Sequence, residues 1–308
     1  MAMNCAIGVT ACITPWNFPA AMQARAVAPA LAAGCVSIVK PSELTPLTAL
    51  AMRNTAMAAG IPPHVLQLLT PDTQQTPAVG LELCTNPVVR HLSFTGSTAV
   101  GKQLMKDSSS TMKRLTLELG GNAPFIVLED ADMEVALSAA MASKFRNAGQ
   151  TCVCADRFLI HETLYEEFVE KFVDRVRQLK VGPGLDPETD IGPLISTAAS
   201  LRVHEKVQGA IKAGAQCLVG GERLMEFGPD SQFYSPTVLT DVPVDDPVWS
   251  MENFGPVAPI RSFATDEEAL AIANDSPVGL AGYFCTRDLS RAFHFAKRYV
   301  GDEQKNET

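Results

Sequence analysis

Two cysteines separated by a single residue are the first candidates for chemistry in the sequence. Cys152 and Cys154 lie in GQTCVCAD, residues 149–156. Four interpretations are open: part of a metal site, a disulfide, two packed thiols, or a nucleophile with a neighbouring thiol. A zinc site needs a second closely spaced pair of ligands, which the cysteines and histidines of this sequence do not supply. We therefore predict no metal site.

The other three interpretations depend on the loop around the two cysteines. In an extended segment their Cα atoms would lie roughly 6.6–7 Å apart, near the upper limit for a disulfide, so a bridge requires a bend. Arg146 lies six residues before Cys152, and a nearby cation favours a reactive thiolate. Spacing alone leaves packed thiols and a nucleophile both open, with Cys154 as a redox candidate.

A second stretch matches part of a phosphate-binding loop. GSTAVGK, residues 96–102, follows a predicted strand and fits the first seven positions of a P-loop. Gln103 replaces the Ser or Thr that would hold Mg²⁺, which argues against an ATPase. The backbone N–H groups of the following helix could still bind the phosphate of a cofactor, and a plain strand–helix turn is the alternative.

Arg25 is an unusual residue in its predicted helix. Apart from Gln23 and Arg25, the segment 20–33 is apolar on all sides, so the sequence predicts a buried arginine with a partner. The partner would be either a structural carboxylate or an anionic ligand.

The bulk composition limits the possible partners. The 308 residues carry a net charge of −9, with a pI of about 5.1, and 46% of them are hydrophobic. Nucleic acid and anionic membrane surfaces attract clustered cations, so neither is an expected partner. No apolar stretch approaches the roughly 18 residues of a membrane span, and the first residues resemble neither a signal nor a transit peptide. Eight scattered cysteines indicate a reducing compartment.

The elements that must position these residues alternate between strands and helices. Strands are predicted at residues 5–14, 35–40, 65–70, 88–95 and 114–119, and helices at 20–34, 46–60 and from 97 onward. This order is typical of a doubly wound α/β sheet. Gly120 and Gly121 end the last of these strands, and we predict a domain boundary there. A second α/β domain would cover residues 121–300, with helices at about 132–144 and 163–180, and a disordered tail at 301–308.

Six motifs together give the sequence a recognisable pattern. They are PWNFP, KPSELTP, FTGS, LELGG, GQTC and ENFGP, in that order along the chain. In this order they resemble the aldehyde dehydrogenase superfamily, and the resemblance covers essentially the whole chain to about Gly301. KFRNAGQTCVCADR, residues 144–157, resembles most closely the succinate-semialdehyde dehydrogenases. The resemblance implies an α/β fold with a Rossmann-type cofactor domain, residues 1–120, and an α/β catalytic domain.

The resemblance also implies a role for each motif residue in the reaction. Cys152 would be the nucleophile, Asn17 a donor to the oxyanion, and Glu118 the general base for thioester hydrolysis. Arg25 and Arg146 match the two arginines that bind the substrate carboxylate, so the expected reaction oxidises succinate semialdehyde to succinate. Glutarate semialdehyde or another short aldehyde is the alternative substrate.

For the cofactor, the resemblance implies a dinucleotide bound along the first domain. The nicotinamide half would contact Trp16, Asn17, Leu119, Glu252 and Phe254. The ribose and pyrophosphate would contact Lys40, Pro41, Ser42, Glu43, Gly96 and Ser97. Since the carboxylate of Glu43 can accept from a ribose 2′-OH and would repel a 2′-phosphate, we expect NAD in preference to NADP.

The family pattern extends beyond both ends of this sequence. The resemblance therefore predicts a truncated chain in which both domains are incomplete and the segments used for assembly into homo-oligomers are absent. An inactive truncated paralogue or fragment is the corresponding alternative function. The expected location is the cytoplasm or the mitochondrial matrix.

Overall fold

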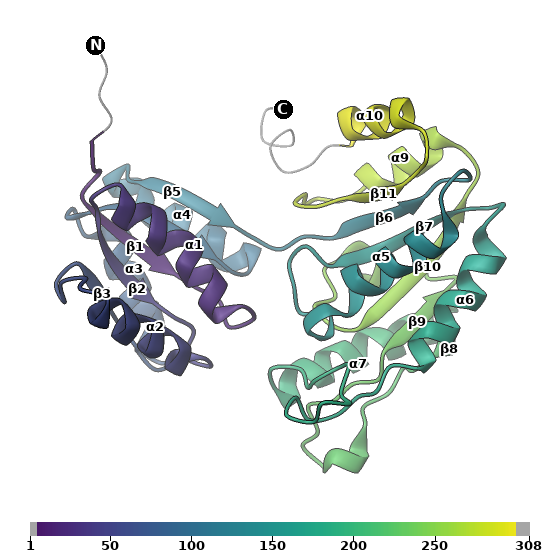
Figure 1. Ribbon diagram of the computed structural model, residues 1–308, viewed down its shortest axis with the longest axis horizontal. Helices are drawn as coiled ribbons and strands as arrows, with labels where there is room; N and C mark the ends of the chain where they lie inside the picture. The colour runs from purple at the N-terminus through teal and green to yellow at the C-terminus, as the bar shows by residue number, and fades with distance from the viewer. Residues whose placement is uncertain (1–4, 300–308) are drawn as a thin grey trace. The chain divides into compact units, whose positions relative to one another are not determined.

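The computed structural model describes residues 5–299, and the predicted disordered tail, residues 301–308, lies outside them. Contacts within the chain divide it into two compact units, Met1–Gly120 and Gly121–Thr308. Each unit has its own sheet, and each is described separately (Figure 1).

The first unit is a parallel sheet of five strands covered by helices. Its strands lie in the order β3-β2-β1-β4-β5, and every neighbouring pair is parallel. The elements in chain order are β1 Val9–Ile13, α1 Pro19–Ala32, β2 Val36–Lys40, α2 Pro46–Ala58, β3 Leu66–Leu68, α3 Thr76–Thr85, β4 Val89–Thr95, α4 Thr98–Ser108 and β5 Arg114–Glu118.

Two apolar clusters fix the helices of this unit to opposite faces of the sheet. Leu83 of α3 and Leu104 of α4 pack with Leu92 and neighbouring strand residues. Val27 of α1 packs with Cys12 and Val39 on the other face. The layers arise because alternate side chains of a parallel strand point to opposite faces and both faces are buried.

The sequence predicted the strands of this unit but missed one helix. Helix α3, TPAVGLELCT, contains a proline and a glycine and shows little amphipathic periodicity, so it did not stand out. The P-loop interpretation is wrong, because α4 begins at Thr98 and the residues that would cradle phosphates are already helical.

The second unit is a six-stranded sheet that is mostly parallel. Its order is β11-β6-β7-β10-β9-β8, and only β8 pairs antiparallel, with β9. The strands are β6 Ala123–Val127, β7 Ala155–His161, β8 Gln216–Val219, β9 Thr237–Thr240, β10 Val257–Phe263 and β11 Tyr283–Cys285. The helices are α5 Met133–Phe145, α6 Tyr165–Arg177, α7 Thr197–Lys212, α8 Pro247–Ser250, α9 Asp266–Asn274 and α10 Leu289–Arg298.

One large core holds the second unit together. It is continuous through the central strands β6, β7 and β10 and includes the stacked rings of Phe168 and Phe172 on α6. Strand β7 is buried at every position. A strand buried on both faces is expected at the centre of a parallel sheet, so the loop before β7 starts from a fixed base.

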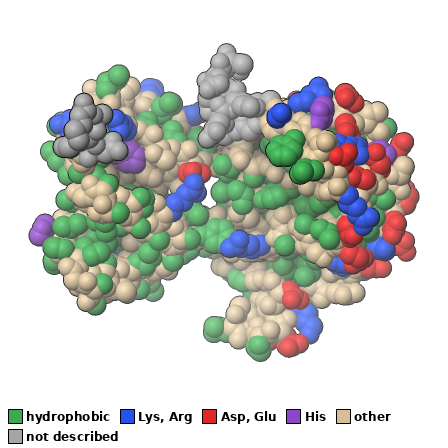
Figure 2. Space-filling view, turned by 45° about the horizontal axis from the view of Figure 1, so that its top comes forward, with side chains coloured by type: hydrophobic (Ala, Val, Ile, Leu, Met, Phe, Trp, Pro, Cys, Tyr) green, Lys and Arg blue, Asp and Glu red, His purple; other side chains and the backbone are tan. Residues whose placement is uncertain are grey.

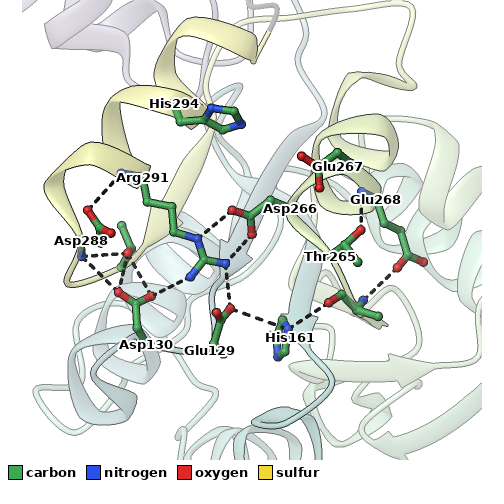
Figure 3. A network of polar contacts seen from close by, with 12 residues as sticks. Glu129, Asp130, His161, Thr265, Asp266, Glu267, Glu268, Asp288, Arg291 and His294 are labelled. Atoms are coloured by element: carbon green, nitrogen blue, oxygen red, sulfur yellow. Dashed lines mark hydrogen bonds and ion pairs between the residues drawn. The ribbon is translucent and has the colours of Figure 1, made fainter.

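Charged side chains attach the last described helix to this unit. Figure 2 shows acidic side chains gathered with Lys and Arg side chains on one face of it. Arg291 of α10 pairs with Asp266 and, at 2.7 Å, with Glu129, while Asp130 accepts from the backbone N–H of Asp288 (Figure 3). Arg291 is thus shared among carboxylates that follow β6 and begin α9, and together with the fully buried Phe295 these contacts fix the position of α10.

Among residues 5–299, no helix is both long enough and apolar enough to cross a membrane.

Candidate active site

The first unit brings several predicted site residues to one edge of its sheet. Its strand order reverses between β1 and β4, and ligands of doubly wound sheets bind at the carboxyl ends of such strands. Trp16 and Asn17 follow the end of β1, while Gly96 and Ser97 follow the end of β4. Lys40 ends the neighbouring strand β2. The topology therefore gathers at one edge the motifs predicted to bind a dinucleotide.

The turn after β4 fits the pyrophosphate of such a cofactor. Ser97 is the N-cap of α4, and its hydroxyl accepts from the backbone N–H of Val100 at 3.4 Å. The first N–H groups of a helix have no partner within the helix and carry partial positive charge. Packing requires glycine at position 96, because a Cβ there would lie 2.5 Å from the Phe94 ring. The predicted residues thus fit the group.

Lys40 and Glu43 form a partly buried ion pair. The Lys40 ammonium lies 3.3 Å from the Glu43 carboxylate, and the lysine side chain is only 6% exposed. Partial burial opposes ionisation, but a backbone N–H and the Lys40 charge hold the pKa of Glu43 below its ordinary value. Glu43 is consequently charged at neutral pH. Pro41 and Ser42 between them are buried, which fixes the turn.

Arg25 and Glu118 are joined in an ion pair. Arg25 Nη2 of α1 donates to Glu118 Oε1 at the end of β5 across 2.5 Å. The prediction of a buried arginine is wrong, since the side chain is 61% exposed and only Gln23 and Val27 of α1 are buried. The partner is one of the residues predicted to take part in the reaction. Next to Glu118, the side chain of Leu119 packs so closely on α4 that a Cβ on Gly101 would lie 2.4 Å from it.

In the second unit, Cys152 lies in a loop with an unusual backbone. After α5 the chain makes a short turn in which Asn147 and Ala148 have φ values of 52° and 54°, and Gly149 has 75°. Left-handed backbone is rare at residues with a side chain and is often found at functional sites. The turn leads the chain to a half-buried Cys152, six residues after Arg146, which is exposed.

Cys154 differs sharply from Cys152. It is 2% exposed, and its thiol donates to the backbone carbonyl of Lys144 at 3.4 Å. Burial raises the pKa of the Cys154 thiol to about 12, so it stays protonated at neutral pH. None of the cysteines among residues 5–299 forms a disulfide. The two cysteines therefore differ: Cys154 is a packed thiol, and Cys152 is the accessible thiol of the pair.

A second loop, which carries Glu252 and Phe254, packs against the Cys152 loop. A Cβ on Gly149 would lie 2.1 Å from the carbonyl oxygen of Gly255, so the two backbones are in direct contact. Phe254 itself has a φ of 50°. A Cβ on Gly121 would likewise lie 2.5 Å from the carbonyl oxygen of Cys152. Glycines thus allow three segments to converge around Cys152.

Glu252 lies in a site that disfavours its charge. Its Oε1 accepts from the backbone N–H of Gly121 at 3.3 Å, and its carbonyl accepts from Lys206 at 2.7 Å. Burial, with a smaller effect of the Asp156 charge, raises the pKa of Glu252 to about 7. The carboxyl group is therefore divided between its two forms near neutral pH.

Behind these loops lies a buried ion pair that the sequence analysis missed. Lys144 Nζ donates to Asp156 Oδ1 at 2.8 Å, and the two side chains are 0% and 1% exposed. Asp156 Oδ2 also accepts from the backbone N–H of Asn253 at 3.2 Å. The signal was present in CADRFLIH, where the charged residues Asp156 and Arg157 interrupt an apolar strand and thereby imply buried partners.

Within residues 5–299, no three His, Cys, Asp or Glu side chains are grouped as a metal site requires. Around Cys152 the second unit brings together the Glu252 loop and Gly121 through close glycine contacts, and the Lys144–Asp156 pair is buried behind them.

A parallel sheet of the dinucleotide-binding type in the first unit and a half-buried cysteine in a loop of the second unit define the class, and comparison with known proteins names the family. The model of the aldehyde dehydrogenase family matches residues 1–302. The chain belongs to the aldehyde dehydrogenase family.

Its similar relatives include enzymes for short semialdehydes. The chain is 50% identical over 287 residues to the NADP(+) succinate-semialdehyde dehydrogenase GabD of Escherichia coli, covering 93% of this chain and 58% of GabD. It is 48% identical over 291 residues to a glutarate-semialdehyde dehydrogenase of Pseudomonas putida, covering 94% and 59%.

A solved structure shows the same fold. The succinate-semialdehyde dehydrogenase of Burkholderia pseudomallei superposes with a TM-score of 0.93 at 50% identity, covering 97% of this chain and 61% of that one. The chain thus spans about three fifths of the length of these relatives, and the predicted fold class is confirmed over that span.

Proposed function

We propose that the protein oxidises a short aldehyde that carries a carboxylate, succinate semialdehyde, to the corresponding acid with NAD(P) as oxidant. The observation that supports this most strongly is the identity of 50% to a succinate-semialdehyde dehydrogenase over 93% of the chain. In this proposal residues 1–120 bind the dinucleotide and residues 121–300 carry the nucleophile.

The reaction proceeds through a covalent intermediate on Cys152. Its thiolate attacks the aldehyde carbon, and the amide of Asn17 and the backbone N–H of Cys152 stabilise the oxyanion of the thiohemiacetal. The nicotinamide ring, when bound, supplies the acceptor for the hydride that leaves this carbon. Glu118 then takes a proton from water, the water oxygen bonds to the thioester carbon, and the thiolate of Cys152 leaves.

Arg25 and Arg146 account for the preference for a carboxylated substrate. A guanidinium matches a carboxylate in shape and charge, and both side chains are exposed. Local cations of this kind allow a protein with a net charge of −9 to bind an anion. Glutarate semialdehyde, longer by one methylene, is the second candidate, because a relative at 48% identity is named for it.

For the cofactor, we propose that Trp16, Leu119, Glu252 and Phe254 contact the nicotinamide half. The rest of the dinucleotide would be held by Lys40, Pro41, Ser42, Glu43, Gly96 and Ser97. We further propose a preference for NAD, supported by the ionised carboxylate of Glu43. The names of two relatives specify NADP(+), so the proposed preference makes this chain differ from them.

The proposal is tested by following NAD(P)H formation by the purified 308-residue chain. Succinate semialdehyde, glutarate semialdehyde and the neutral butanal are compared by kcat/KM, with Cys152→Ala as the inactive control. We expect the carboxylated aldehydes to exceed butanal by about tenfold or more, the worth of one well-placed charged hydrogen bond. A folded chain that forms no NAD(P)H would instead support the alternative of an inactive paralogue, and equal rates would exclude the carboxylate preference.

A further inference from the structure

The ion pair between Arg25 and Glu118 joins two residues with different proposed tasks. Arg25 would bind the substrate carboxylate, and Glu118 would activate water. In the structure, Arg25 Nη2 donates to Glu118 Oε1 at 2.5 Å. The guanidinium is therefore occupied by Glu118 instead of the substrate, and the carboxylate is occupied by Arg25 instead of water. While this pair persists, the carboxylate that should accept a proton is engaged by a guanidinium.

We propose that the substrate carboxylate replaces Glu118 on Arg25 and so frees Glu118 to act as the base. This inference rests on the proposed function and deepens it. Arg25 would then determine specificity twice: when the substrate binds, and again when the thioester is hydrolysed. The exchange itself makes and breaks only ionic hydrogen bonds and needs no further reactant.

The location of the pair makes such an exchange inexpensive. The side chains of Arg25 and Glu118 are 61% and 24% exposed. Exposed ion pairs contribute little net free energy, because water solvates both partners and salt screens them. The new pair of Arg25 with the substrate carboxylate has the same net charge as its pair with Glu118, and water can solvate the freed Glu118 carboxylate, which is already 24% exposed. A pair as buried as Lys144–Asp156 could not exchange in this way.

The backbone of Glu118 restricts the change to the side chain. Glu118 pairs with Thr95 in the ladder between β4 and β5, and its carbonyl accepts from the backbone N–H of Gly96 at 3.0 Å. The strand end is therefore fixed while the carboxylate can rotate. Release of Glu118 consequently requires side-chain torsions only, which change on a time scale far shorter than turnover.

A substrate without a carboxylate should reveal the effect of the Arg25–Glu118 pair on thioester hydrolysis. A neutral acyl donor can still acylate Cys152, but it leaves Glu118 engaged by Arg25, so hydrolysis of the thioester is slowed. Removing the guanidinium should then accelerate hydrolysis of a neutral acyl group while impairing use of a carboxylated substrate. If Arg25 only bound the substrate, its removal would leave the hydrolysis of a neutral acyl group unchanged. If Arg25 had a structural role, its removal would slow the reactions of neutral and carboxylated substrates alike.

The test uses 4-nitrophenyl acetate, a neutral ester that acylates a thiol without any cofactor. The initial burst of nitrophenolate reports acylation of Cys152, and the steady state reports hydrolysis. For Arg25→Gln we expect an unchanged burst and a steady state faster by about twofold to fivefold, the range for release of an exposed pair. Arg90→Gln, which alters an exposed arginine on β4, is the matched control and should leave both phases unchanged.

The double variant Arg25→Gln/Glu118→Gln identifies the path of the effect. It should lose the acceleration, because the base that Arg25 restrained is absent. A steady state in Arg25→Gln that is unchanged or slower, in a protein that melts at the same temperature as the parent, would overturn the inference. Failure of the proposed function would show separately, as absence of NAD(P)H formation from succinate semialdehyde.

A binding measurement tests the same exchange without turnover. Succinate is titrated into the Cys152→Ala chain and its Glu118→Gln and Arg25→Gln derivatives by calorimetry. Removing the internal competitor should tighten succinate binding by about twofold to fivefold in Glu118→Gln, and Arg25→Gln should weaken it. Equal affinity with and without the Glu118 carboxylate would refute the exchange.

Discussion

Two ion pairs near the predicted site residues illustrate opposite uses of charge. Lys144–Asp156 is sealed inside the second unit, with exposures of 0% and 1%, whereas Arg25–Glu118 lies on the first unit with 61% and 24%. The buried pair has lost its solvation, so neither partner can leave without leaving an isolated charge behind. The exposed pair can exchange partners at little cost. Burial thus separates a charge pair that holds loops from one that can respond to a ligand.

The neighbours of the buried pair show what it holds. Asp156 accepts from Asn253, next to Glu252, and Lys144 lies at the end of the helix that leads to the Cys152 loop. Although burial opposes it, the charge of Asp156 holds the pKa of Lys144 above its ordinary value. Lys144 therefore stays charged, and its pair with Asp156 connects the thiol loop with the loop of Glu252.

The largest expected effect comes from breaking the buried pair. Asp156→Ala leaves the Lys144 charge buried and unpaired, so we expect the free energy of unfolding to fall by about 3–5 kcal/mol. Urea unfolding followed by circular dichroism measures this. The matched variant Lys144→Met/Asp156→Ala should recover at least half of the loss, because it removes the isolated charge. If the free energy of unfolding fell by less than about 1 kcal/mol in Asp156→Ala, the buried pair would stabilise the chain no more than an exposed pair does.

Glu252, beside the buried pair, shows how burial affects a carboxyl group that has no cation among residues 5–299 bonded to it through its side chain. Its pKa is about 7 in the folded chain against an ordinary 4.5, so the folded state keeps a proton that the unfolded state loses. Stability contributed by this proton is present at low pH and declines as the pH rises from about 4.5 to 7.

Glu252→Gln should consequently stabilise the chain at pH 8, on the order of 2 kcal/mol, and have little effect at pH 4.5. Denaturant unfolding at both pH values provides the measurement. An equal gain at both would attribute the effect to packing instead of proton binding.

The Lys40–Glu43 pair is intermediate in burial, and we expect the charge of Glu43 to influence the choice between NAD and NADP. Glu43→Ser removes the carboxylate and leaves the Lys40 cation, so the ratio of kcat/KM for NADP to that for NAD should rise by about tenfold. Parallel assays with the two cofactors decide this. Lys102→Ser, a change of an exposed residue on α4, is the control. An unchanged ratio would remove Glu43 from cofactor selection.

The smallest effect on stability is expected from the exposed pair. Arg25→Gln should lower the free energy of unfolding by less than about 1 kcal/mol, because the pair is solvated. Thermal unfolding of this variant beside Glu118→Gln and the double variant gives the coupling between the two side chains. A coupling of several kcal/mol would contradict the contrast between the two pairs.

The sequence predicted the first unit well, and physical reasons account for the omissions. Continuous apolar runs marked its buried strands, and Gly34 and Gly60, both with positive φ, marked the ends of α1 and α2. Beyond about residue 192 the sequence analysis predicted no elements. The segments there combine short strands with helices of mixed polarity, such as α7, whose apolar and polar residues are less clearly separated than those of α6.

The candidate site could be predicted as a set of residues but not as a set of contacts. The motifs indicated Cys152 and Glu118, and the resemblance indicated Arg25, yet Arg25 and Glu118 are 93 residues apart in the sequence. Their pairing depends on α1 packing beside the sheet that ends in β5, which no local pattern contains. Lys144 resembles a surface lysine at a helix end, and only the fold shows that it is buried.

The contact between Gly149 and Gly255 has a consequence for how this sequence can vary. A Cβ on Gly149 would lie 2.1 Å from the carbonyl oxygen of Gly255, and no rotation of a side chain relieves a clash with backbone. The motifs GQTC and ENFGP therefore do not vary independently of each other. A side chain at position 149 requires the backbone at Gly255 to move. A change in one motif must therefore be accompanied by a change in the other.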